Sequence, residues 1–131
     1  MQVVSPIDIE DVLRIDLAAL ASSYRVFAPP VPTDLQAGDV MITALGGAAV
    51  SGSSHEYDVS VDVYEEDEAA AAISANEIHG LVVSLPVMST STQYSDARAG
   101  LPYDNHDPNA PQLSRRTFRA TVICPGQALE F

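Results

Sequence analysis

Residues 55 to 64 alternate between apolar and polar side chains. The apolar side chains occupy odd positions: Tyr57, Val59, Val61 and Val63. The polar ones occupy even positions: Glu56, Asp58, Ser60 and Asp62. Successive side chains of a strand point to opposite faces, so this segment is predicted to be a strand with one buried face and one negatively charged face.

A helical pattern follows this strand. The acidic run from Glu65 to Glu68 suits the positive N-terminal end of a helix. Pro86 is expected to end the helix. In between, one stripe of the helix is apolar: Ala71, Ala75, Ile78, Leu81, Val82 and Leu85.

An earlier helix is predicted over about residues 6 to 22, from apolar residues that recur with a 3.6-residue period. Ser5 can act as its N-cap, Pro6 suits the first helical position, and Asp8 takes the acidic place of a capping box.

Shorter runs predict four more strands and three connecting segments. The strands are expected at residues 24–28, 39–45, 87–94 and 115–124. The connecting segments are a proline-rich extended connector at 29–32, a mobile Gly/Ser loop at 46–54, and a loop rich in Asp, Asn, Gly and Pro at 96–111.

These elements predict one α+β domain over residues 1–131. Its core is a mostly antiparallel sheet of four to five strands, with two helices packed on one face and a polar face opposite. The acidic strand bearing Asp58 and Asp62 is expected to lie beside the last strand, which bears Arg115 and Arg119. The expected result is a set of cross-strand ion pairs.

Charge narrows the possible partners. The chain has 18 acidic and six basic residues, all six arginine, and a net charge of −12. Like charge repels nucleic acid, so DNA or RNA binding is disfavoured. The sequence contains no apolar run long enough to cross a membrane. The single cysteine favours a reducing, cytoplasmic environment.

No motif indicates catalysis, a metal or a cofactor. His55 is expected on the face opposite Glu56 and Asp58, and the turn around His106 lacks the glycine and glutamate of a calcium loop. Cys124 falls on an apolar face, as a buried small hydrophobic residue does. The expectation is therefore a protein that is not an enzyme, with no metal site and no cofactor.

The arginines instead suggest contacts between subunits. Arg115, Arg116 and Arg119 cluster in a chain that is otherwise strongly negative. Besides local pairing, a basic edge of this kind can meet the acidic face of another copy, and such head-to-tail contacts close into rings when the rotation allows.

Three stretches together resemble the tail terminator (tail completion, or minor tail) proteins of long-tailed bacteriophages. They are the N-terminal amphipathic helix, the segment 57–65 running into an Ala-rich helix, and the late block 100–122. That block combines a Gly-Pro-aromatic loop, arginines and an alternating last strand. Many relatives carry tryptophan where this chain has Tyr64.

The resemblance implies a hexameric ring that caps the tail tube, stops its polymerisation and joins it to the head–neck connector. It implies a virion protein of the tail or neck, assembled in the host cytoplasm, with tail tube protein and connector as partners. DNA would pass through the lumen without specific binding. Candidates for the lumen or the subunit interface are Glu56, Asp58, Asp62, Arg115, Arg116 and Arg119.

Two alternatives stay open at the level of sequence. One is another phage neck or tail component, either a head-completion stopper or the tail tube protein, which would polymerise without limit. The other is a small monomeric cytoplasmic binding module that uses the loops 46–54 and 96–111 as its ligand-contacting surface.

Overall fold

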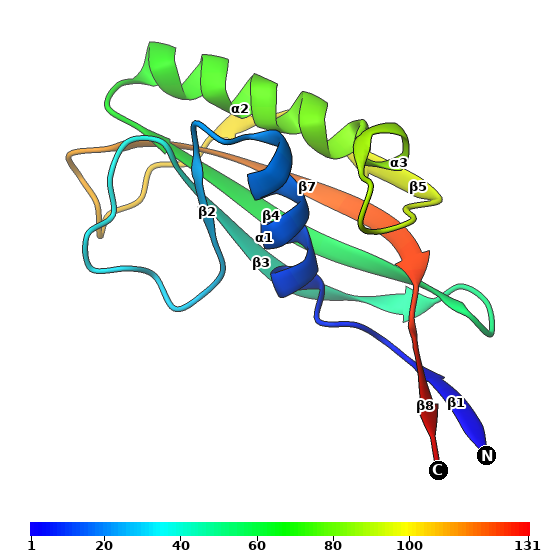
Figure 1. Ribbon diagram of the computed structural model, residues 1–131. Coiled ribbons are helices and arrows are strands. Elements are labelled where there is room, and N and C mark those ends of the chain that lie inside the picture. The colour runs from blue at the N-terminus through cyan, green and yellow to red at the C-terminus, as the bar shows by residue number, and fades with distance from the viewer.

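The computed structural model describes all 131 residues as an α+β fold with a layer of helices over one face of a sheet (Figure 1). The helices are α1 (Ile9–Leu20), α2 (Glu68–Val83) and α3 (Leu85–Met88). The strands are β1 (Gln2–Ser5), β2 (Arg25–Phe27), β3 (Asp39–Ala49), β4 (Ser54–Glu65), β5 (Asp96–Ala99), β6 (Tyr103–Asp104), β7 (Ser114–Pro125) and β8 (Gln127–Glu130).

The main sheet has six strands in the order β2-β3-β4-β7-β5, and β6 also pairs with β7. All its pairs are antiparallel except that of β2 with β3. A separate two-stranded sheet joins β1 to β8. The α+β class and the mainly antiparallel sheet agree with the prediction, whereas the number of strands is larger than the expected four to five.

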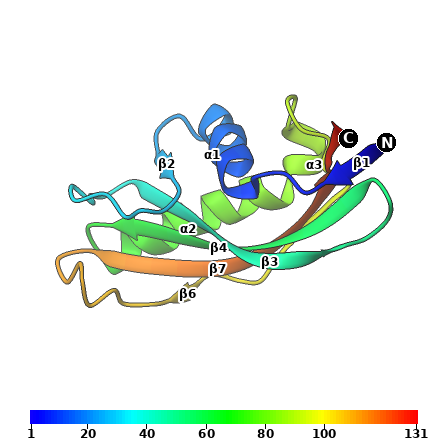
Figure 2. The same ribbon diagram turned by 90° about the horizontal axis from the view of Figure 1, so that it is seen from below.

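All three helices lie on the same side of the main sheet, as Figure 2 shows edge-on. The core between them combines the odd positions of β4 with the even positions of β7, and Val61 faces Phe118 across the ladder. From α1 it takes Leu13 and Leu17, which are almost completely buried. The predicted apolar face of residues 55–64 is therefore correct.

The start of α1 differs from the prediction. The helix begins at Ile9, and the Asp8 side chain caps it by accepting a hydrogen bond from the Asp11 N–H. Ser5 belongs to β1 and is not the cap. For α2 the acidic run acts as expected, because the Asp67 carboxylate accepts from the Ala70 N–H at 2.8 Å.

The predicted mobile loop at 46–54 is mostly strand. β3 continues to Ala49 and β4 starts at Ser54, so only residues 50–53 form the turn. A bulge between Ala44 and Gly46 shifts the register. Gly47 has φ of +149°, and a Cβ there would lie 1.9 Å from the Glu56 carbonyl oxygen, so only glycine fits this close approach.

The predictions for the segment after α2 are wrong in two places. Residues 87–94 are not a strand, because the short helix α3 runs over Leu85–Met88 with Pro86 in its first turn, and residues 89–94 are irregular. The expected loop 96–111 contains β5 and β6, which form the far edge of the sheet beside β7.

Candidate interaction surface

The side of the main sheet that no helix covers is called the open face. It carries the even positions of β4 and the odd positions of β7, so Glu56, Asp58 and Asp62 lie beside Arg115 and Arg119 as expected. Arg116 is the exception among the candidates. It lies opposite Val63 and shares, by alternation, the covered side with Phe118.

The predicted ion pairs between these strands do not form. The register places Asp58 opposite Thr121 and Asp62 opposite Thr117. The threonine hydroxyls donate to the carboxylates, at 2.7 Å to Asp58 and 2.6 Å to Asp62. The core pairing on the other face, with Val61 opposite Phe118, fixes this register, so the acidic residues face hydroxyls rather than arginines.

Asp62 lies beneath a loop and is only 7% exposed. The Thr117 hydroxyl that donates to Asp62 also accepts from the Asn105 side chain at 3.1 Å. Burial raises the pKa of Asp62, and the Thr117 hydrogen bond and the charge of Arg115 oppose part of that rise. Asp62 thus holds the loop to the sheet and contributes almost no surface.

Arg115 also fixes this loop. Its Nε donates to the Asn105 carbonyl oxygen at 2.6 Å, and its guanidinium lies 6.0 Å from the centre of the Tyr64 ring. The Tyr64 hydroxyl in turn donates to Asp107 at 3.2 Å. Because Arg115 already has these partners, its main role in the subunit is to position the loop.

The remaining candidates are accessible. Glu56 forms an ion pair with Arg98 of β5 at 3.1 Å, and Asp58 is half-buried. Arg119 is exposed in the middle of the open face, and no carboxylate pairs with it or with Arg116. Two of the six arginines therefore have no ion-pair partner in a chain with a net charge of −12.

The negative charge is concentrated away from the open face. On that face the arginines of β5 and β7 offset most of the acidic residues. The excess lies at the N-terminal ends of two helices, around α1 and α2: Asp8, Glu10, Asp11, Glu65, Glu66, Asp67 and Glu68. The open face thus carries both signs of charge, as expected from an acidic strand beside a basic one.

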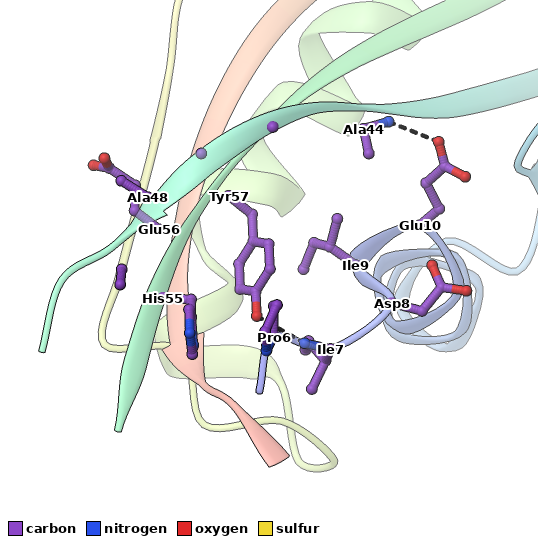
Figure 3. Close-up of a pocket in the computed structure, with 13 residues that line it drawn as sticks. Pro6, Ile7, Asp8, Ile9, Glu10, Ala44, Ala48, His55, Glu56 and Tyr57 are labelled. Atoms are coloured by element: carbon purple, nitrogen blue, oxygen red, sulfur yellow. Dashed lines mark hydrogen bonds between the residues drawn. The ribbon is translucent and has the colours of Figure 1, made fainter. Parts of the chain in front are cut away.

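A pocket of about 460 Å³ lies at one end of the sheet, between the start of α1 and the β3–β4 hairpin (Figure 3). Its two sides are tied together by hydrogen bonds. The Ile7 N–H donates to the Tyr57 hydroxyl at 3.0 Å, and the Ala44 N–H donates to the Glu10 carboxylate at 2.8 Å. The sequence gives no signal for this pocket, because its walls are more than thirty residues apart along the chain.

His55 stands at the rim of this pocket, close to the point where β7 passes into β8. Its Nδ1 is buried and has no hydrogen-bond partner. A Cβ at Gly126 would lie 2.9 Å from that nitrogen and 2.3 Å from the Ser5 carbonyl oxygen. Gly126 therefore allows the chain ends to leave the domain side by side.

The other reactive groups are internal. Burial raises the pKa of the Cys124 thiol to about 11. The buried Tyr94 hydroxyl donates to Asp16 of α1, and burial together with that carboxylate raises the pKa of Tyr94. No group of three or more His, Cys, Asp or Glu side chains is arranged to hold a metal ion. None of the helices has the length and apolarity that a membrane span needs.

Comparison with known proteins gives a distant structural likeness. No family model matches the chain, and no curated protein matches it. Among solved structures, the fold is similar to a chain from "Virion of native gene transfer agent (GTA) particle". The identity is 16%, the TM-score is 0.49, and the match covers 84% of each chain.

Proposed function

We propose that this chain is a structural protein of a phage-like virion, several copies of which form a ring. In this proposal the ring, with six subunits, caps the tail tube, ends its polymerisation and joins it to the head–neck connector. The chain has no catalytic role, and its partners are other copies of itself, the tail tube protein and the connector protein.

The observation that carries the proposal is Arg119, which is exposed on the open face without a carboxylate partner, while the exposed Glu66 and Glu68 at the start of α2 have no partner in their own subunit. Within one subunit these groups do not meet. Between copies, a contact of arginine with a carboxylate on a different surface is head-to-tail, the geometry that generates rings. The net charge of −12 would let DNA pass through the lumen without adhering.

The arrangement of the resembling stretches supports the same proposal. The first becomes α1, the second becomes β4 running into α2, and the third becomes β6 and β7. In the fold β4 pairs with β7 along its whole length, and both helices cover that side of the sheet. The likeness noted in the sequence therefore concerns one contiguous part of the molecule.

The experiment is a measurement of mass in solution by light scattering after size exclusion, at several concentrations and two salt levels. Discrete hexamers, or monomers that become hexamers at higher concentration, are expected. Higher salt should weaken the assembly, because it screens charged contacts at the surface. Open-ended growth would indicate a tail tube protein instead.

A charge reversal tests the role of Arg119 directly. Arg119→Glu is expected to lower association without changing the midpoint of thermal unfolding, because the side chain is exposed and has no partner in its own subunit. Arg14→Glu is the matched control, since Arg14 is also on the surface but pairs with Asp11 of its own helix. Equal effects of the two variants would argue against a specific contact.

A monomeric binding module is the second candidate, and one observation favours it: the pocket of about 460 Å³. Its lining includes Gly46 to Ala49, part of the segment that the sequence suggested as ligand-contacting surface. A strict monomer at every concentration would support this candidate over the ring.

A further inference from the structure

Gly80 lies inside α2, where nothing in its own subunit requires a glycine. A Cβ built there would meet no atom within 4 Å outside the backbone of its own helix, and the backbone is not left-handed at this position. Glycine destabilises a helix relative to alanine, because it loses more backbone freedom on folding. The subunit therefore loses stability at Gly80 and gains no internal contact from it.

Gly80 forms part of the wall of a groove on the helix layer, the layer made by α1, α2 and α3. The groove has a volume of about 470 Å³ and lies between α2 and the turn after α1. It is lined by residues 20–24, Glu77, Gly80, Leu81 and Ser84, of which Glu77 alone is charged. The Glu77 carboxylate accepts from the Tyr24 hydroxyl at 3.2 Å, and no arginine pairs with it. The groove thus contains one negative charge that no cation neutralises.

Ile73 lies one turn before Glu77 on the same side of α2. Residues four apart are neighbours on a helix surface and are separated by about 6 Å along the axis. Ile73 is 66% exposed. The exposed isoleucine of α1, Ile15, lies one turn after Asp11, which is already paired with Arg14. We call Ile73, Glu77 and the groove the α2 patch.

The open face carries the complementary groups beside β6. Tyr103 is 48% exposed and lies opposite Thr117, and Arg119 follows on the same face of β7, about 7 Å further along the strand. Leu101, which is 82% exposed, follows Gly100, whose N–H donates to the Arg119 carbonyl oxygen at 2.9 Å. We call Leu101, Tyr103 and Arg119 the loop patch.

Two features prepare the loop patch for a contact. β5 and β6 both pair with β7, so the segment between them loses little freedom when another surface covers it. Asp104, next to Tyr103 in the sequence, lies opposite Arg116 and by alternation shares the covered side, so it adds no negative charge to the patch. Tyrosine and arginine are also among the residues that contribute most to interfaces.

We infer that the loop patch of one copy docks on the α2 patch of a second copy. In this contact Arg119 pairs with Glu77, Tyr103 packs on Ile73, and Leu101 enters the groove. The occupant is a second copy because the loop patch supplies the cation that the groove lacks. In both patches an exposed apolar side chain lies about 6–7 Å from the charge, so the two sets of groups match in spacing.

The inference rests on the proposed function, in that it names the two surfaces through which copies assemble. The open face and the helix layer lie on opposite sides of the main sheet (Figure 2). Each copy can therefore bind one neighbour with its loop patch and another with its α2 patch. Such a head-to-tail contact closes into a ring when the rotation between neighbours allows it.

Filling the groove is the first test. Gly80→Leu places a bulky side chain in open space on a helix and replaces glycine by a better helix former, so the midpoint of thermal unfolding should be equal or higher. The concentration needed for half-assembly, measured by light scattering, should rise roughly tenfold. The matched control is Ala18→Leu, which adds the same side chain to the exposed surface of α1 outside the groove and should leave association unchanged.

A charge exchange tests the pair itself. Glu77→Arg should weaken association roughly tenfold, as Arg119→Glu does, because each places two like charges together. A chain with both substitutions should regain most of the association, since the pair is restored in reverse. The control combines Arg119→Glu with Glu68→Arg and has the same net charge. It should not recover, because Glu68 lies at the exposed start of α2 outside the groove.

The outcomes separate the inference from the proposed function. If Gly80→Leu assembles as readily as the unmodified chain, the inference is overturned and the ring remains. Equal recovery by the two double variants, or equal weakening by Gly80→Leu and Ala18→Leu, also overturns it. A chain that stays monomeric at every concentration contradicts both.

Discussion

The two faces of the β4–β7 ladder are held together by different forces, although they belong to the same two strands. On the covered face, Val59, Val61 and Phe118 exclude water completely. On the open face, threonine hydroxyls of β7 donate to carboxylates of β4. The covered face supplies most of the stability, because apolar burial scales with area and each hydrogen bond adds only about 1 kcal/mol. The open face is therefore free to be shaped for contacts.

The largest effect is expected on the covered face. Phe118→Ala should lower the free energy of unfolding by about 3–5 kcal/mol, because it leaves a cavity beneath α2 where the ring also meets His79. Urea unfolding measures this. Arg119→Ala, one position along on the open face, should change it by less than about 0.5 kcal/mol. Similar losses in both variants would mean that the two faces are not distinct.

A smaller effect is expected where the open face is covered by the loop. Thr117→Val keeps the shape of the side chain but removes the donor to the buried Asp62 carboxylate, at a cost of about 1–3 kcal/mol. Thr43→Val is the control, since Thr43 lies on the open face of β3 and has no side-chain hydrogen bond. No difference between the two would show that Asp62 finds another donor.

The corresponding change beside Asp58, which no loop covers, should lower the stability of the fold by less. Thr121→Val removes the donor to Asp58, but Asp58 is half-buried and water can replace the hydroxyl. The expected loss is about 0.5–1 kcal/mol, which the midpoint of thermal unfolding resolves. A loss as large as that of Thr117→Val would place Asp58 in a drier environment than its exposure indicates.

The direction in which stability changes with pH gives a further test of how buried Asp62 is. The pKa of Asp62 is raised by folding, so the folded state binds its proton more tightly than the unfolded state does. Its favourable contribution is complete below the unfolded pKa and is lost as pH rises through the folded pKa. Asp62→Asn, which can still accept from Thr117, should therefore be more stable than the unmodified chain at neutral pH, with the advantage vanishing in acid.

Unfolding curves at several pH values check this expectation. An advantage of Asp62→Asn that persists at acidic pH would mean that the substitution acts through packing and not through the charge.

The sequence predicted the features that depend on strong local patterns. The alternation over residues 55–64 and the acidic run before α2 located both elements, because each is repeated over many residues. The partners of Asp58 and Asp62 could not be predicted, since a shift of the register by one residue would exchange threonine for another side chain. The pairing of β1 with β8 also escaped prediction, because four residues at each end of the chain carry too short a pattern.

The position of the loop over Asp62 could not be predicted for a similar reason. One of its hydrogen bonds joins Asp107 to Tyr64, more than thirty residues away along the chain. Another joins Asn105 to Arg115 near the start of β7. Its composition correctly indicated turns but did not indicate which surface they would cover. The candidate residues were thus placed on the correct strands, whereas the division between buried and accessible ones required the three-dimensional contacts.

The pairing of β1 with β8 makes the order of the elements along this chain circular. A short linker from Phe131 to Met1 would turn the β1–β8 pair into an ordinary hairpin, and new ends could be opened in the exposed turn at residues 50–53. Loop-closure entropy grows slowly with length, so the permuted chain is expected to keep its core, which thermal unfolding would test. Where the chain is cut then decides which strand carries a free end, while the arrangement of the sheet stays the same.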